Sequence, residues 1–214
     1  MIEIISHRGI WYDKEDRNTL PSFEKSLELG FGIETDIRDH EGEIVISHDP
    51  PKQSKNLITF DEFLFLYQSS IVKPNLALNI KADGLADMLK KKLDQYNVLN
   101  YFVFDMSVPD CLNYRKEELI YYTRQSEIEC NPFLYEDSYG IWLDCFYKDW
   151  IDKETILFHY GNKKNMCIVS PELHGRPYKE AWQTYKDIMK SNPNIEISIC
   201  TDYPTEAKEY FAEN

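Results

Sequence analysis

The sequence predicts an α/β fold, a (β/α)₈ TIM barrel that forms a single compact domain over residues 1–214. Short apolar segments alternate with amphipathic ones along the whole chain, and eight of them have the length and composition of strands. Strands separated by helices pair in parallel, and eight such units in roughly 210 residues fit a small barrel. A doubly wound sheet is the alternative, but it does not naturally use eight repeats with polar residues at every strand end.

The expected strands are runs rich in β-branched and aromatic residues. In chain order they are Ile2–Ser6, Ile33–Ile37, Leu76–Ile80, Tyr101–Asp105, Leu119–Thr123, Gly140–Asp144, Met166–Ser170 and Ile195–Cys200. After the second strand, Arg38–Ser47 predicts a small β-hairpin that turns at His40-Glu41-Gly42.

Capping residues place the expected helices. Leu20–Leu29 follows Asn18 or Thr19 as its N-cap and ends at Gly30. The segment Thr59–Ser69 begins with a Thr-x-x-Glu capping signal. The other expected helices are Gly84–Asn97, Pro109–Lys116, Asp152–Tyr160, Tyr178–Asn192 and Pro204–Ala212.

Composition excludes several classes of partner. A formal net charge of −13 argues against nucleic acids and anionic membrane surfaces, which require a basic patch. No apolar run approaches ~18 residues, so no integral membrane association is expected. Five cysteines without a CxxC pair predict buried thiols, and the first strand begins at Ile2 without room for a signal peptide, so we expect a cytoplasmic protein. Nothing in the sequence indicates an oligomeric state.

Two carboxylates on the second expected strand predict a metal site. Glu34 and Asp36 are two residues apart, so both point to the same face of a strand. The apolar neighbours Ile33 and Ile37 predict that this strand is buried, where two carboxylates without a cationic partner are unstable. Oxygen ligands of this kind suit Mg²⁺ or Ca²⁺.

Histidines flank this acidic pair on both sides. His7 follows the first strand and His48 follows the hairpin, and two histidines suit a general acid and a general base. Arg8, next to the first histidine, suits binding of a phosphate. The sequence does not assign the acid and the base between the two histidines.

Taken in order, these motifs resemble those of the glycerophosphodiester phosphodiesterase family, within the wider group of barrel phosphodiesterases. The matching motifs are His7-Arg8-Gly9, Asn18-Thr19, Glu34-Thr35-Asp36 and His48-Asp49, with a weaker match at Thr201-Asp202-Tyr203-Pro204. The resemblance implies a metal-dependent phosphodiester hydrolase of lipid metabolism. Its substrate would be a small anionic glycerophosphodiester, cleaved to an alcohol and a phosphomonoester with His7 and His48 as catalytic residues.

One motif departs from the family pattern. The family usually has Glu-x-Lys at the end of the third strand, with the glutamate as a third metal ligand, whereas this chain has Asn79-Ile80-Lys81. The resemblance implies that Lys81 contacts phosphate and that Asn79 replaces an acid. An amide oxygen can bind a metal but adds no charge, so we expect weaker binding or a compensating acid, for which Glu172 is our hypothesis. Asn18 is either a phosphate contact, as the resemblance implies, or an N-cap.

Two alternatives stay open for the reaction. The resemblance implies that a neighbouring hydroxyl of the substrate attacks first, giving a cyclic phosphate that water opens, and a phospholyase would stop at that cyclic product. The change at Asn79 also fits a catalytically weakened barrel that only binds a phosphorylated metabolite. Because Pro50–Lys73 has room for only a loop and one helix, we expect an open site and a small substrate rather than a lipid.

Overall fold

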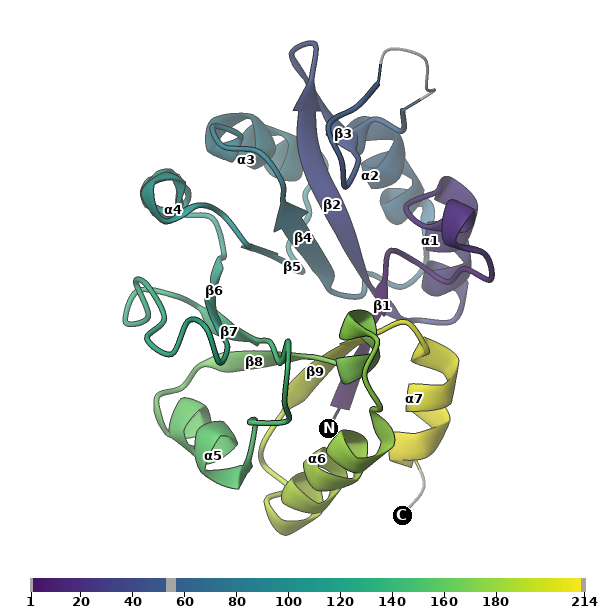
Figure 1. Cartoon of the computed structure of the whole chain (residues 1–214). Helices are drawn as coiled ribbons and strands as arrows, with labels where there is room; N and C mark the ends of the chain where they lie inside the picture. Colours follow the sequence, from purple (N-terminus) through teal and green to yellow (C-terminus); the bar gives the residue numbers. More distant parts are fainter. Residues whose placement is uncertain (1, 53–56, 213–214) are drawn as a thin grey trace. The chain divides into compact units, whose positions relative to one another are not determined.

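The computed structural model describes residues 2–52 and 57–212, and its helices and strands alternate along the chain (Figure 1). The chain divides into two compact units, which are described separately. The N-terminal unit is Ser6–Tyr121, and the C-terminal unit combines Met1–Ile5 with Tyr122–Asn214. Strand β1 (Ile2–His7) contributes its last two residues, Ser6 and His7, to the N-terminal unit.

The sheet of the N-terminal unit positions every motif of the first fifty residues. Strands β2 (Gly32–His40), β4 (Leu76–Ile80) and β5 (Tyr101–Phe104) are parallel, and β3 (Glu43–Ile46) pairs antiparallel with β2 as the predicted hairpin. The helices of this unit are η1 (Lys14–Asp16), α1 (Leu20–Glu28), α2 (Phe60–Ser69), α3 (Ala86–Gln95) and α4 (Val108–Lys116). The expected strand Leu76–Ile80 has the bounds that the sequence predicts.

Helix starts in this unit follow the capping signals. Thr59 accepts a hydrogen bond from the Glu62 amide, and the Glu62 side chain in turn accepts one from the Thr59 amide, as the predicted capping box requires. Thr19 caps α1 through the Ser22 amide. The alternative in which Asn18 is the N-cap is therefore wrong, and the Asn18 side chain is available for another role.

The C-terminal unit contains four parallel strands in the order β6 (Tyr122–Gln125), β7 (Gly140–Leu143), β8 (Asn165–Val169) and β9 (Ile197–Thr201). Its helices are α5 (Lys153–Gly161), η2 (Pro171–His174), α6 (Lys179–Ser191) and α7 (Pro204–Ala212). The expected strand Leu119–Thr123 starts too early in the prediction. Leu119 follows α4 and closes its C-terminal cap, because its amide donates to the Tyr114 carbonyl over 3.0 Å.

Aromatic side chains form much of the core in each unit. In the N-terminal unit, the fully buried Phe23 of α1 meets Phe63 of α2 edge to face, with ring centroids 4.8 Å apart. In the C-terminal unit, Trp182 is fully buried and its indole donates to the Ser170 hydroxyl over 2.8 Å. Burial of side chains this large contributes roughly 2–3 kcal/mol each to stability. These contacts hold the helices on the strands and so fix the strand ends.

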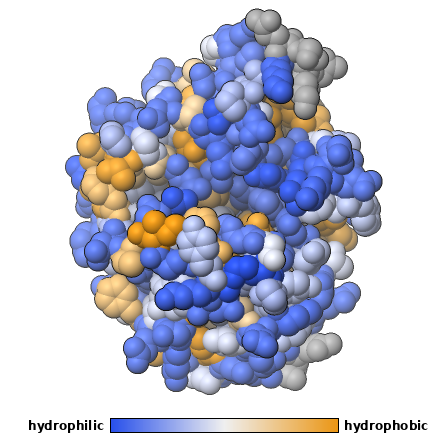
Figure 2. Space-filling view, viewed as in Figure 1, coloured by the Kyte–Doolittle hydropathy of each residue, from blue (hydrophilic) through white to orange (hydrophobic). Residues whose placement is uncertain are grey.

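The predicted buried thiols are confirmed for four of the five cysteines. Cys111, Cys145, Cys167 and Cys200 are buried, Cys130 is exposed, and all five are free. Figure 2 shows a surface that is mostly hydrophilic on the face in view, with hydrophobic groups in smaller patches. Among the described residues, no helix combines the length and the hydrophobicity needed to cross a membrane.

His159 on α5 is a buried histidine that holds three segments of the C-terminal unit together. Its Nδ1 atom lies 2.7 Å from the Tyr135 hydroxyl and its Nε2 atom 2.8 Å from the Gln125 side-chain oxygen. Because that oxygen only accepts, Nε2 donates, and in the neutral ring Nδ1 accepts from the Tyr135 hydroxyl. Burial, assisted by the nearby Lys164, lowers the pKa of His159 to about 4.

We expect this histidine to make the fold sensitive to acid. Since the pKa is lowered on folding, the unfolded chain binds a proton below about pH 6.5 and the folded chain does not, so stability falls as pH falls from there toward 4. Between pH 7.5 and pH 5, His159 should account for a loss of about 2 kcal/mol in the free energy of unfolding. Urea unfolding of the wild type and of His159→Gln at both pH values measures this loss. Equal losses in the two proteins would contradict the assignment.

Candidate active site

Four predicted site residues lie on one face of the paired strands β2 and β4. Glu34 and Asp36 are 1 % and 0 % exposed, and both point to the same side of β2. The register pairs Asp36 with Asn79, and Lys81 follows two residues later on the same side of the chain. The structure therefore brings together two carboxylates, an amide and an amine at the carboxyl end of parallel strands.

Asp36 is the centre of the charge network at this site. Its Oδ2 atom forms an ion pair with Arg8 Nε and accepts a hydrogen bond from Asn18 Nδ2, each over 2.8 Å, and its Oδ1 atom lies 3.3 Å from Lys81 Nζ. Thr35 donates to the Asn18 side-chain oxygen over 2.9 Å, which turns the amide nitrogen of Asn18 toward Asp36. One buried carboxylate thus positions all three side chains for which the resemblance implies phosphate contacts.

Glu34 connects His7 and Asn79. Its Oε2 atom lies 3.8 Å from His7 Nε2, and its Oε1 atom accepts from Asn79 Nδ2 over 3.3 Å. Burial raises the pKa of Glu34, and the negative charge of Asp36 raises it further, while His7, Arg8 and Lys81 act in the opposite direction. A further cation beside Glu34 would therefore stabilise its ionised form.

Oxygen atoms at this site fit a divalent cation. Glu34 Oε2, Asp36 Oδ1 and Asn79 Oδ1 are buried and accept no hydrogen bond, although Lys81 forms an ion pair with Asp36. Oxygen donors from carboxylates and amides are what Mg²⁺ and Ca²⁺ prefer. Over residues 2–52 and 57–212 there is no group of three His, Cys, Asp or Glu side chains that could hold a metal, and the third oxygen at this site belongs to the amide of Asn79.

Left-handed backbone in the loop after β1 aims Arg8 and Asn18 at Asp36. These residues have φ angles of 61° and 56°, and the Arg8 carbonyl accepts from the Asn18 amide over 3.0 Å. Such conformations are unfavourable for residues with a side chain and persist where the surroundings enforce them. Gly9 has a φ angle of 82°, and a Cβ atom there would lie 2.4 Å from the Ser22 hydroxyl oxygen. The glycine after Arg8 is thus required by the close approach of α1.

His48 reaches the site from the end of β3. The amide of the preceding Ser47 donates to the Asp36 carbonyl over 3.1 Å, which fixes this segment against the end of β2. The half-exposed His48 ring is oriented by Asp49, whose carboxylate lies 2.8 Å from Nδ1, and this hydrogen bond lowers the pKa of Asp49. Nε2 is the ring nitrogen that this pairing leaves for proton transfer.

A cavity of about 560 Å³ adjoins these residues. Arg8, Asn18 and His48 line it, together with three basic side chains that the sequence analysis missed, namely Lys14, Arg17 and Lys52. The spacing of Lys14 and Arg17 is one turn of a 3₁₀ helix, which η1 forms, and a basic pair in so acidic a chain is the signal that could have identified them. A lining with this many basic side chains would suit an anionic ligand.

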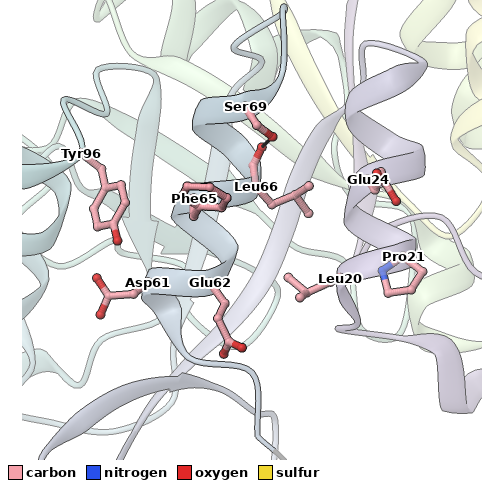
Figure 3. A pocket seen from close by; sticks show the side chains of 9 residues that line it. All are labelled: Leu20, Pro21, Glu24, Asp61, Glu62, Phe65, Leu66, Ser69 and Tyr96. Carbon is pink, nitrogen blue, oxygen red and sulfur yellow. Dashed lines mark hydrogen bonds between the residues drawn. The ribbon is translucent and has the colours of Figure 1, made fainter.

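The N-terminal unit also contains an apolar groove of about 530 Å³ between α1 and α2 (Figure 3). Leu20 and Pro21 line it from α1, and Phe65 and Leu66 line it from α2. None of the predicted catalytic, phosphate-binding or metal-binding residues takes part in it. The candidate active site is therefore the polar cavity next to His48.

Glu172 lies in η2 of the C-terminal unit, and both of its carboxylate oxygens accept hydrogen bonds there. The donors are the hydroxyl groups of Ser170 and Thr201 and, over 3.1 Å, the Asp202 amide. Burial raises the pKa of Glu172 against the effect of these hydrogen bonds. The bonds join η2 to the end of β9, and the metal-binding role of Glu172 stays a prediction.

Comparison with solved structures finds the same fold in phosphodiester-cleaving enzymes. A Galdieria sulphuraria protein, provisionally described as a glycerophosphodiester phosphodiesterase, has a TM-score of 0.80 and 16 % identity over 100 % of this chain and 98 % of its own. The glycerophosphodiester phosphodiesterase of Agrobacterium tumefaciens str. C58 has a TM-score of 0.69 and 15 % identity over the full length of both chains. A Ca²⁺-dependent phosphatidylinositol-specific phospholipase C from Streptomyces antibioticus has a TM-score of 0.56 and 9 % identity over 98 % of this chain and 96 % of its own.

These likenesses confirm the predicted (β/α)₈ barrel fold over the length of the chain. No family model matches the sequence, and no curated protein does so either. At identities this low the likeness concerns the fold, and the chemistry has to be argued from the side chains.

Loss of the central carboxylate should destabilise the protein. Asp36→Asn leaves the charges of Arg8 and Lys81 without their buried partner, so we expect a loss of about 3 kcal/mol in the free energy of unfolding. The matched control is Asp39→Asn, an exposed position on the same strand, for which we expect a change within about 0.5 kcal/mol. Urea unfolding of both variants measures the difference. Equal stabilities would show that Asp36 does not hold the network together.

Proposed function

We propose that this chain is a divalent-cation-dependent hydrolase that cleaves a small glycerophosphodiester into an alcohol and a phosphomonoester. The observation that carries the proposal is the collection of Arg8, Lys81 and Asn18 around one buried carboxylate, Asp36, beside Glu34. The barrel fold, and the names of structures that share it, support the same chemistry. A cytoplasmic location remains part of the proposal.

Glu34, Asp36 and Asn79 would hold the cation, Mg²⁺ or Ca²⁺. Their unbonded oxygens support this assignment, and the calcium dependence named for the Streptomyces phospholipase agrees with a divalent cation in this fold. When bound, the ion would act as a Lewis acid toward a phosphate oxygen. Asn79 contributes an oxygen without a charge, so the site would carry one negative charge fewer than a site with three carboxylates.

Arg8 and Lys81 would bind and orient the phosphodiester group. Both are charged donors, and donors of this kind stabilise negative charge that develops on phosphate oxygens. Their present partner, Asp36, holds them at the strand ends, and Asn18 would add a neutral donor from the same side. The three side chains are thereby positioned before the substrate arrives.

His7 and His48 would move the protons. One removes the proton from the attacking hydroxyl, and the other gives a proton to the oxygen of the leaving alcohol as its bond to phosphorus breaks. In our proposal a neighbouring hydroxyl of the glycerol moiety attacks first, and water then opens the resulting cyclic phosphate with the two roles exchanged. The contacts of His7 with Glu34 and of His48 with Asp49 orient the two rings for these steps.

Two other outcomes have observations in their favour. The likeness to a phospholipase C favours a phospholyase, for which the cyclic phosphate would be the final product. Asn79 in place of an acidic ligand favours a barrel that binds a phosphorylated metabolite with little turnover. Phosphorus NMR of the reaction mixture separates the three, because it distinguishes a phosphomonoester, a cyclic phosphate and unreacted diester.

Hydrolysis should depend on both a divalent cation and His48. Metal-stripped protein should be inactive on glycerophosphodiesters and regain activity with Mg²⁺ or Ca²⁺. His48→Ala should lower kcat by about 100-fold or more, because it removes a proton-transfer group, and should keep the calorimetric affinity for the cation. His40→Ala, outside the proposed site, is the control and should keep its activity. Near wild-type turnover in His48→Ala would exclude the proposed pair of histidines.

Cation affinity should respond to the charge at position 79. Asn79→Glu should raise the affinity for Ca²⁺ by about tenfold, because a third carboxylate adds negative charge to the ligand set, whereas Asn79→Leu should lower it. Isothermal titration calorimetry measures both without the need for turnover. Glu172→Gln tests the alternative acid, since a ligand role requires a loss of affinity in that variant. If none of the three substitutions changes the affinity, the cation is bound elsewhere.

A further inference from the structure

We propose that the cavity beside His48 selects diesters whose alcohol carries a second anionic group, with Arg17, Lys14 and Lys52 as the residues that recognise it. The inference deepens the proposed function and rests on it. The preferred substrate class is then a glycerophosphodiester with a phosphorylated alcohol, rather than one with a neutral or cationic alcohol.

Charge in this cavity is opposite in sign to that of the chain. The chain has a net charge of −13, yet among the described residues the cavity is lined by four fixed cations and two carboxylates, those of Glu15 and Asp49. A cavity in which one sign of charge predominates raises the local concentration of ligands with the opposite sign. An acidic protein that concentrates cations in one cavity is suited to bind an anion there.

The phosphodiester group alone does not account for these cations. Arg8 is paired with Asp36 and is already assigned to the phosphodiester, as is Lys81. Lys14, Arg17 and Lys52 belong to other parts of the cavity wall, on and after η1 and on the segment after His48. The single charge of a phosphodiester is matched by Arg8 and Lys81, and the other three cations add positive charge along the rest of the wall, where a second anionic group would be favoured.

Arg17 is held in place by an aromatic ring. Its guanidinium carbon lies 3.9 Å from the centre of the Trp11 ring, and the Trp11 indole donates to the His7 carbonyl over 3.0 Å. Stacking on a ring restricts the planar guanidinium and leaves its N–H groups directed outward in the plane, as bidentate binding of a phosphate requires. Arg17 is thus tied through Trp11 to the strand end that carries a proposed catalytic histidine.

The volume of the cavity is sufficient for the alcohol. At about 560 Å³ it is within the usual range of small-molecule sites, roughly 300–1,000 Å³. Since Arg8 lines the same cavity as Lys14, Arg17 and Lys52, a diester bound at Arg8 can extend its alcohol toward these three basic side chains. The proposal therefore requires no rearrangement of the chain.

A matched pair of substrates tests the preference. Glycerophosphoinositol and glycerophosphoinositol 4-phosphate differ only in one phosphate, so the ratio of their kcat/KM values isolates its recognition. We expect wild type to prefer the phosphorylated diester by at least about tenfold, and Arg17→Gln and Lys14→Gln each to remove most of that preference. Lys25→Gln, a lysine of α1 that does not line the cavity, is the control and should keep the ratio. A wild-type ratio near one, or a ratio that both cavity variants leave unchanged, would overturn the inference.

Binding measured without turnover separates this inference from the proposed function. Calorimetric titration of His48→Ala with each diester should show tighter binding of the phosphorylated one, and His48→Ala/Arg17→Gln should lose the difference. If the wild type hydrolyses neither diester but this difference in binding is found, the hydrolase proposal fails and the anion site stands. If hydrolysis is found and the two diesters bind equally, the anion site fails and the hydrolase proposal stands.

Discussion

The structure of the site depends on burying the carboxylate of Asp36. A charge at 0 % exposure must be compensated, and Arg8, Lys81 and Asn18 do so from three different parts of the N-terminal unit. The same contacts explain the local backbone. Arg8 and Asn18, which have left-handed backbone in the loop after β1, are also the loop residues whose side chains contact the Asp36 carboxylate. Folding of the unit and construction of the proposed phosphate site are therefore one event.

The balance between positive and negative charge at this site depends on Asn79, which supplies a neutral amide beside the two carboxylates. In the described structure two carboxylates face two permanent cations, and His7 supplies a third group that can carry positive charge. A divalent ion would have to share the oxygens of Asp36 with Lys81, since Asn79 supplies an amide rather than an acid at this position. Ion binding in such a site is expected to be modest and to strengthen when an anionic substrate engages the arginine and the lysine.

Periodicity and capping carried much of the fold prediction. Alternation along β2 placed Glu34 and Asp36 on one face, and the capping box at Thr59 located α2, because both rules depend on local geometry. The start of β6 was missed because Leu119 closes the C-terminal cap of α4 through a backbone hydrogen bond that no side chain signals. The basic side chains of Lys14 and Arg17 were missed as cavity residues because their position depends on how the loop around η1 folds over the cavity. A loop of this kind has no periodic sequence pattern.

Every predicted catalytic and phosphate-binding residue lies in the N-terminal unit, as do three of the four predicted metal ligands, Glu34, Asp36 and Asn79. The four motifs that begin at His7, Asn18, Glu34 and His48 all fall within the first fifty residues. Sequence identity to two proteins with the same barrel fold, averaged over the whole chain, is 16 % and 15 %. An average of this kind gives equal weight to barrel positions that many apolar residues can fill. Distant proteins with this fold should therefore be easier to detect by the spacing of a few polar residues in one part of the chain than by overall similarity.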